Sequence, residues 1–151
     1  MKQYSFYNTD LIIDGARVEG FTAGNAIITA NRNVPQHLPV MDAYGKLAVA
    51  TTADQSGSVT FPLLQTADWN DILYSKAQLT QATGLSGNKS LWQPIQLQIV
   101  DKMGDVLVTG VNGCILKQPA IQRGVSFTSN LWAIYVERLI IQTGSYPDIG
   151  V

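Results

Sequence analysis

Short segments in which apolar and polar residues alternate dominate the chain, and they predict β-strands. The clearest is Ile-Gln-Leu-Gln-Ile at 95–99, where one face is apolar and the other carries amides. An apolar run at 11–13 ends at Asp-Gly, a strong turn dipeptide, so the alternating residues 17–21 can pair back on it. Residues 130–142 are apolar on both faces, which predicts a central or covered strand.

Two further strands, at 46–52 and 58–64, flank a short polar segment and predict a hairpin. Residues 31–44 differ, because they contain Pro35 and Pro39 and show little periodicity. Proline removes a donor from the strand ladder, so we expect a long loop there. A loop of that length within a compact domain usually has a function.

Residues 66–81 predict one helix. Thr66 or Asp68 can cap its start by accepting backbone N–H bonds, and Gly84 is expected to end it. An apolar stripe at helical spacing should face the sheet. The members of that stripe are Trp69, Ile72, Leu73 and Ala77.

The order of strands, helix and strands indicates an α+β domain that is mostly β. We expect a rolled antiparallel β-sheet or barrel-like sandwich with one packed α-helix. A single domain is expected over residues 1–151, with the long loop at 31–44 and an extended C-terminal tail at 144–151.

Composition adds a constraint on the surface. Charged residues make up only 14% of the chain, against about 25% in a typical soluble domain. A monomer so poor in charge would struggle to cover its own surface, which favours burial against other copies. The formal net charge is −1, and the basic residues form no run or stripe. The electrostatic footprint of a protein that grips nucleic acid is therefore missing.

Residues that could carry chemistry are few and scattered. The one cysteine, Cys114, lies in an apolar run and is interpreted as a small buried hydrophobe. The one histidine, His37, lies in the predicted loop, whereas a zinc site normally takes four ligands. Three pairs of aspartates lie close in the sequence and could do acid–base chemistry: 68 with 71, 101 with 105, and 10 with 14. Helix capping accounts for the first pair and turn formation for the other two. We therefore expect no catalytic, cofactor-binding or metal-binding residues, no cofactor and no enzymatic activity.

Three groups of segments, taken in order, resemble the tail tube proteins of contractile-tailed bacteriophages. They are residues 4–6 with 11–15, residues 56–70, and residues 117–124 with 132–144. The stretch 56–70 is similar to the strand-into-helix signature of that family. The similarity covers most of the chain, although 31–39 is richer in proline and the tail from 145 is longer than in the family pattern.

The resemblance implies a structural virion protein that forms stacked hexameric rings. Such rings make the hollow inner tail tube that conducts DNA during ejection, an architecture shared with the tube of type VI secretion systems. The implied partners are further copies of the chain, the tail sheath, baseplate and tail terminator proteins, and the tape measure protein and transient DNA in the lumen. The implied location is the virion tail, assembled in the host cytoplasm without a membrane. An N-terminus without the apolar segment of a signal peptide fits that expectation.

Within such a tube, the apolar face of each lumen strand should turn toward the helix and the polar face toward the channel. Ile95, Leu97 and Ile99 are then buried, as are Val59, Phe61 and Leu63. The residues expected to line the lumen are Lys46, Ala48, Ala50, Thr52, Ser58, Thr60, Gln96, Gln98 and Thr109.

The proline-bounded loop is expected to make contacts between subunits or rings, because it is too apolar to be idle in water. Its candidate contact residues are Asn31, Arg32, Val34, Pro35, His37, Leu38, Val40 and Met41.

Two functions of other classes stay open at this point. A monomeric β-rich ligand-binding module, for example one that binds carbohydrate, would use Trp92 and Tyr44 as sugar platforms. A small hydrolase would use Asp101 or Cys114. The mass of the particle in solution separates the assembling protein from the monomeric module.

Overall fold

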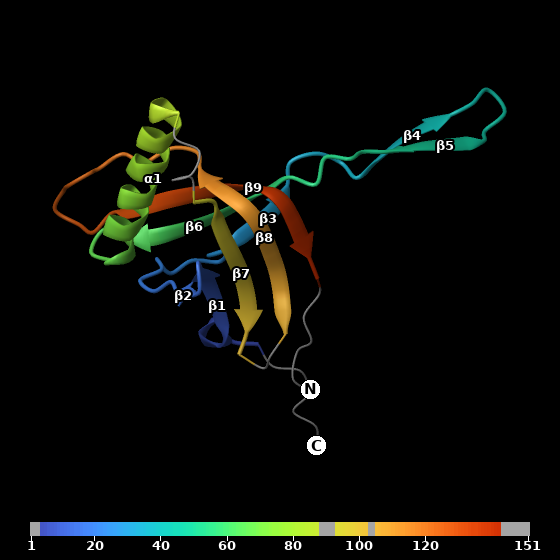
Figure 1. Cartoon of the computed structure of the whole chain (residues 1–151). Helices are drawn as coiled ribbons and strands as arrows, with labels where there is room; N and C mark the ends of the chain where they lie inside the picture. The colour runs from blue at the N-terminus through green and yellow to red at the C-terminus, as the bar shows by residue number, and fades with distance from the viewer. Residues whose placement is uncertain (1–3, 88–92, 103–104, 143–151) are drawn as a thin grey trace, which may run out of the picture.

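The computed structural model describes residues 4–87, 93–102 and 105–142. Seven antiparallel strands form one sheet in the order β2-β1-β7-β8-β9-β6-β3 (Figure 1). Their bounds are β1 Thr9–Ile13, β2 Ala16–Arg17, β3 Thr29–Arg32, β6 Gly57–Leu64, β7 Ile95–Asp101, β8 Val106–Ile115 and β9 Ser129–Ile141. The remaining elements are the strand pair β4 (His37–Met41) and β5 (Leu47–Thr51), the short helix η1 (Phe6–Asn8) and the helix α1 (Trp69–Ser86).

The predicted fold class is confirmed: an antiparallel, mostly β architecture with one packed α-helix. The sheet does not close into a barrel within the subunit, so β2 and β3 are its edges. The predicted central strand is β9, which lies between β8 and β6. The predicted tail at 144–151 lies outside the described residues.

The hydrophobic core lies on one face of this sheet. In β7 the apolar residues are buried and Gln96 and Gln98 are exposed, as the alternation predicted. In β6 the burial alternates in the same way, with Ser58 and Thr60 half-buried on the other face. The predicted core residues that the structure buries are Val59, Phe61, Leu63, Ile95, Leu97 and Ile99.

Close packing in the middle of the sheet requires glycine in β8. A Cβ atom on Gly110 would lie 2.8 Å from Leu97 Cγ and 3.0 Å from Val136 Cγ1. Side chains of β7 and β9 therefore close over the strand between them, at distances that any larger residue would disturb.

The helix is shifted and rotated relative to its prediction. It runs from Trp69 to Ser86, and it ends at Gly87, which adopts a left-handed φ of 71°, and not at Gly84. Asp68 occupies the N-cap position without a side-chain capping bond. Leu73 is fully buried as predicted, but Ile72 is 44% exposed, so its predicted contact with the core is wrong.

A buried amide explains the rotation. Asn70 is 5% exposed, and its Nδ2 donates to the carbonyl oxygen of Leu64 at 2.7 Å. Its Oδ1 accepts from Trp132 Nε1 at 2.9 Å. A pattern based on hydrophobicity places an asparagine outside, whereas these bonds satisfy it inside. Trp69 is only half-buried, and its Nε1 donates to the carbonyl oxygen of Arg17 at 2.9 Å.

The predicted hairpin between 46–52 and 58–64 is wrong. The strand β5 pairs with β4, not with β6, and β6 pairs with β3 and β9 in the main sheet. Half of the predicted loop at 31–44 is therefore strand: Asn31 and Arg32 belong to β3, and residues 37–41 form β4. Pro39 is tolerated because β4 has only one neighbouring strand, which leaves one side of its backbone unpaired.

The loop of residues 116–128, here called the far loop, is fastened to the helix at its base. Tyr74 packs edge-on against Trp132, with ring centroids 4.7 Å apart, and its hydroxyl donates to the carbonyl oxygen of Pro119 at 2.8 Å. Gln118 Nε2 donates in return to the backbone oxygen of Tyr74 at 3.2 Å. Burial raises the pKa of Tyr74, and the charge of Arg123 opposes this shift to a smaller extent.

We predict that the two neighbouring helix residues differ sharply on substitution. Leu73→Ala should lower the free energy of unfolding by about 2–5 kcal/mol, because it leaves a cavity in the core. Ile72→Ala, the matched control at an exposed position, should lower it by less than about 1 kcal/mol. Urea denaturation of the purified protein measures both, and equal losses would contradict the rotated packing of α1.

Alkaline pH should expose the role of Tyr74. Because its pKa is raised on folding, the protonated phenol is favoured in the folded state, so stability is complete below the unfolded pKa, near 10, and falls as pH rises through the folded pKa. Tyr74→Phe should cost about 1 kcal/mol at neutral pH through the lost bond and should reduce the fall above pH ~10. Urea titrations of both proteins at neutral pH and above pH ~10 measure the two effects. Tyr135→Phe retains Tyr74 and should keep the wild-type slope.

Candidate assembly surfaces

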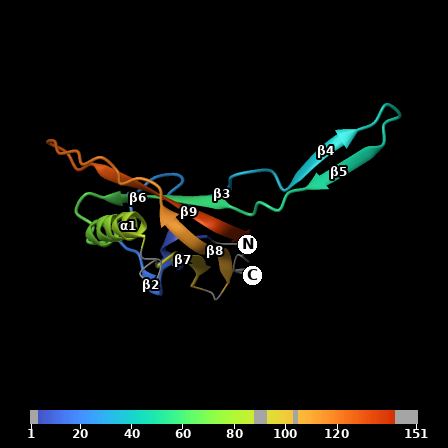
Figure 2. The ribbon, with the colours of Figure 1, turned by 45° about the horizontal axis from the view of Figure 1, so that its top comes forward.

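The strand pair β4–β5 projects from the body of the protein as an arm, defined as residues 37–51 (Figures 1 and 2). Its two-stranded ladder has no covering layer, and every residue of both strands is exposed. The large apolar side chains on it are more than half exposed: Leu38 55%, Val40 65%, Met41 59%, Leu47 61% and Val49 51%. An isolated hairpin of this kind is marginal in water, so the arm needs a partner.

The arm is shaped at both of its ends by hydrogen bonds. At the tip, Asp42 Oδ1 accepts from the backbone N–H groups of Tyr44 and Lys46, each at 2.8 Å, and Gly45 supplies a φ of 81°. Near the base, His37 Nδ1 and Thr51 Oγ1 lie 3.3 Å apart across the two strands.

A cluster of polar side chains fixes the arm to the sheet. Ser56 is 5% exposed, and its Oγ accepts from Asn33 Nδ2 at 3.1 Å and from the Tyr135 hydroxyl at 3.0 Å. Ser58 Oγ donates to Asn33 Oδ1 at 2.9 Å. Hydrogen bonds from the hydroxyl and backbone N–H of Ser56 hold the pKa of Asp54 below its ordinary value. The direction of the arm is therefore set by the main sheet.

The face of the main sheet opposite α1, here called the open face, is polar and nearly neutral. It carries Gln96, Gln98, Thr109, Ser58 and Thr60, which the sequence predicted to lie together. The structure brings these five onto one sheet. It does not bring Lys46, Ala48, Ala50 and Thr52 there, because they belong to the arm and its flanks.

Amide hydrogen bonds cross the open face. Gln96 Nε2 donates to Asn112 Oδ1 at 3.0 Å, and Asn112 Nδ2 donates to Glu137 Oε2 at 2.9 Å. Asn112 has a φ of 55°, which places it at the irregular pairing where β8 bulges. Sequence analysis missed Asn112 and Glu137, and only the neighbouring glycine at 113 hinted at a bulge. At one edge, Arg17 and Asp10 form an ion pair at 2.9 Å.

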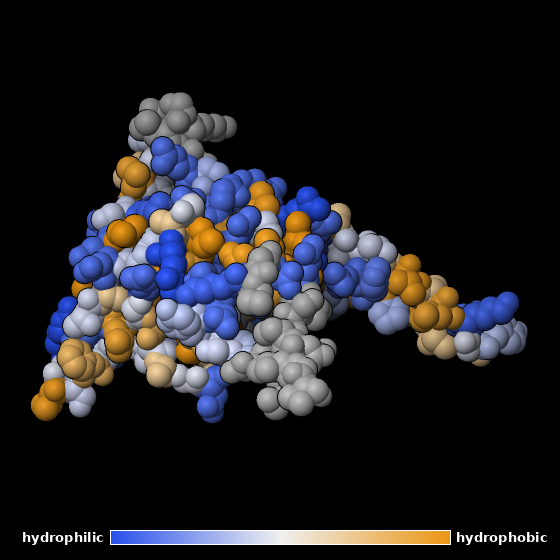
Figure 3. All heavy atoms as spheres, turned by 90° about the horizontal axis from the view of Figure 1, so that it is seen from below, coloured by the Kyte–Doolittle hydropathy of each residue, from blue (hydrophilic) through white to orange (hydrophobic). Residues whose placement is uncertain are grey.

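The far loop forms the second apolar projection. Ile121 is 70% exposed, Phe127 74%, and Val125 fully exposed. At its base lies a groove of about 470 Å³ lined by Leu116, Lys117, Pro119, Leu131 and Ala133, among others. Figure 3 shows hydrophobic side chains along the arm and also at the opposite extremity of the molecule. Sequence analysis did not single out this loop for assembly.

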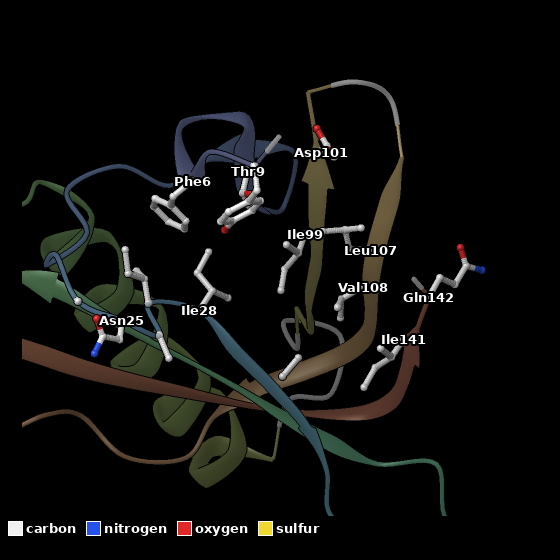
Figure 4. Close-up of a pocket in the computed structure, with 15 residues that line it drawn as sticks. Phe6, Thr9, Asn25, Ile28, Ile99, Asp101, Leu107, Val108, Ile141 and Gln142 are labelled. Carbon is white, nitrogen blue, oxygen red and sulfur yellow. The ribbon is translucent and has the colours of Figure 1, made fainter. Parts of the chain in front are cut away.

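A larger hollow, of about 610 Å³, lies where the core face of the sheet continues past the helix (Figure 4). Phe6 and Ile28 approach it from the N-terminal segment and the loop before β3, while Ile99, Leu107 and Ile141 come from the sheet. The lining is mainly apolar.

The residues considered for chemistry lie apart. Asp101 is at the turn end of β7 and Cys114 near the opposite end of β8, while His37 is on the arm. Among the described residues, no three His, Cys, Asp or Glu side chains gather in a way that could hold a metal ion. Tyr44 is 92% exposed at the tip of the arm, and Trp92 lies outside the described residues. Within the described part of the chain, no helix has the length and apolarity that crossing a bilayer requires.

No family model matches the sequence, and no curated protein matches it. Solved structures match in fold. The sheath/tube terminator of the extracellular contractile injection system PVC, in its extended state, has a TM-score of 0.56 at 13% identity, covering 95% of this chain and 99% of that one. The tube-terminating cap of the anti-feeding prophage has a TM-score of 0.51 at 16% identity, covering 94% and 93%.

A chain of the PVC sheath–tube complex, also in the extended state, has a TM-score of 0.52 at 12% identity, covering 94% of this chain and 93% of that one. Nearly the whole of the present chain takes part in each match. At these identities the likeness concerns the fold. The fold of this chain is thus one that structural components of contractile injection systems also adopt.

Proposed function

We propose that this chain is a structural subunit of the tube in a contractile, tail-like injection particle. The observation that carries the proposal is a sheet covered on one face by one helix, with a nearly neutral polar face left open. The end-to-end similarity of fold to tube terminators and to a sheath–tube chain supports it.

The proposed assembly is a closed ring, hexameric as the sequence resemblance implies, that stacks on further rings. Heterologous contacts between identical copies close into a ring when the rotation per subunit allows it. The exposed apolar arm supplies such a contact, since its side chains need cover from outside the subunit. Candidate contact residues on and beside the arm are Asn31, Arg32, Val34, Pro35, His37, Leu38, Val40 and Met41.

In this ring the open face lines the lumen, with Gln96, Gln98, Thr109, Ser58 and Thr60 toward the channel. Amides and hydroxyls keep such a wall hydrated while offering few fixed charges. A cargo with a charged backbone, DNA in the case of a phage tail, would pass with little retention. This lining leaves out Lys46, Ala48, Ala50 and Thr52, which belong to the arm and its flank.

The partners that follow are further copies of the chain, a sheath around the tube, and baseplate, terminator and tape measure proteins at its ends and in its lumen. Sheath contacts would fall on the outer side of α1, where Ile72 and Leu79 are 44% and 57% exposed. The particle would be assembled in the host cytoplasm, and the chain would have no enzymatic role.

A second candidate function is termination of the tube. The similar structures include a terminator and a tube-terminating cap. Both candidates predict rings, but a tube subunit adds ring on ring as its concentration rises, whereas a terminator stops at one. Negative-stain microscopy over a concentration series separates them.

Purified protein should form rings or tubes that light scattering detects well above the 16.4 kDa of one chain. Replacing residues 35–54 by a short Gly-Ser connection should abolish assembly, because it removes the arm. The free energy of unfolding should change by less than about 1 kcal/mol, since loop length alters closure entropy only weakly. A 16.4 kDa species at every concentration and salt would exclude the proposal.

Labelling should locate the lumen. In a Cys114→Ala background, biotin attached to Gln98→Cys should bind streptavidin in the isolated subunit but not in the assembled tube, because a protein of that size cannot enter the channel. Biotin on Ser75→Cys, on the exposed side of α1, is the control and should stay accessible in both. Equal access at the two positions in intact tubes would place the open face elsewhere.

A further inference from the structure

We propose that the arm of one subunit docks in the groove at the base of the far loop of its neighbour. The groove is lined by Leu116, Lys117, Pro119, Leu131 and Ala133, with other residues around it. The inference rests on the proposed function and names the surface that receives the arm. It follows from the apolar character, the placement and the charge of the two surfaces.

The two surfaces are matched in character. Both strands of the arm are exposed throughout, and its five large aliphatic and thioether side chains are all more than half exposed. In the groove, Leu116 is 61% and Leu131 64% exposed. Leu131 lies on the open face of β9, opposite the buried Trp132. Burial of apolar surface stabilises association by about 25 cal/mol per Å² before the costs of binding. Each surface therefore offers the other the apolar cover that its own subunit does not provide.

Their placement forbids contact within one subunit. The arm joins the sheet at the first residues of β6. The groove lies at the other end of this strand, where Pro62 pairs with Leu131. Eight residues of strand separate these ends, which is about 25 Å at the usual rise. The arm points away from the far loop (Figure 2), and the Ser56 cluster fixes its direction. Only a second copy can bring an arm to this groove.

Charge also favours the pairing. The far loop carries Lys117 and Arg123 and no acidic residue between positions 116 and 128. The arm carries Asp42 near its tip, with Lys46 as its one basic residue. Attraction between Asp42 and the two cations of the far loop helps to fix the orientation of the two surfaces. The larger apolar hollow, lined by Ile28 and Ile99 among others, is a separate site from the groove at the far loop.

Cysteine cross-linking between two full-length variants tests the contact. In a Cys114→Ala background, Val40→Cys and Leu131→Cys are purified separately, mixed, allowed to assemble and oxidised mildly. We expect the disulfide-linked heterodimer to exceed either variant's homodimer roughly tenfold or more, because an interface raises the effective concentration of the two thiols. The double variant should give a ladder of covalent oligomers. Ile28→Cys replaces Leu131→Cys as the matched control in the larger hollow.

The outcomes separate this contact from the proposed function. Rings that form without the Val40–Leu131 cross-link, or that link Val40 to Ile28 instead, would overturn the contact and leave the tube proposal standing. Absence of any assembly would overturn both. As a second measurement, K117E/R123E should reduce the heterodimer yield several-fold at low salt and less at high salt, since screening weakens the charge attraction. An unchanged yield at low salt would show that charge attraction does not contribute to the contact.

Discussion

The structure depends on one constraint: a single helix can cover only one face of a seven-stranded sheet. The buried apolar residues of β6, β7 and β9 point to the covered face, where α1 and the N-terminal loops enclose them. The opposite face must then be stable against water, and it carries amides and hydroxyls with few charges, among them Glu137 and the Arg17–Asp10 ion pair. A sheet built in this way is covered on one side and hydrated on the other.

The covered face is held together by polar groups as well as by hydrophobic burial. Asn70 joins three parts of the fold, because it lies on α1, donates to the end of β6 at Leu64, and accepts from Trp132 in β9. Buried polar groups with all partners satisfied specify one arrangement more sharply than apolar contacts do. Tyr74, one helical turn later, packs on the same tryptophan and holds the base of the far loop. The tryptophan is thus where the helix, the sheet and the base of the far loop meet.

The sequence predicts features that depend on consecutive residues, such as turns and strand alternation. It does not predict features that depend on a distant partner, such as strand pairing and the rotation of the helix. The Asp14–Gly15 turn and the alternation of β7 are properties of consecutive residues, and both are confirmed. The strand at 47–51 is predicted correctly, but its predicted pairing with 58–64 is wrong, because alternation does not show which strand lies beside it. The proline at 39 argued for a loop, yet it is allowed in a two-stranded arm. Ile72 was placed inside because a hydrophobicity pattern cannot see that Asn70 finds hydrogen-bond partners in the core.

The candidate assembly surfaces differ in how far the sequence predicts them. The polar face of the sheet follows from period-two geometry, so Gln96 and Gln98 could be placed from sequence. The far loop could not, because its apolar residues at 121, 125 and 127 form no regular pattern and matter only once the structure shows them uncovered. Low charge already indicated that the surface was made for contact. The structure adds that the exposed apolar residues gather at two opposite ends. Copies joined end to end cover both ends, and such a heterologous contact closes into a ring when the rotation per subunit allows it.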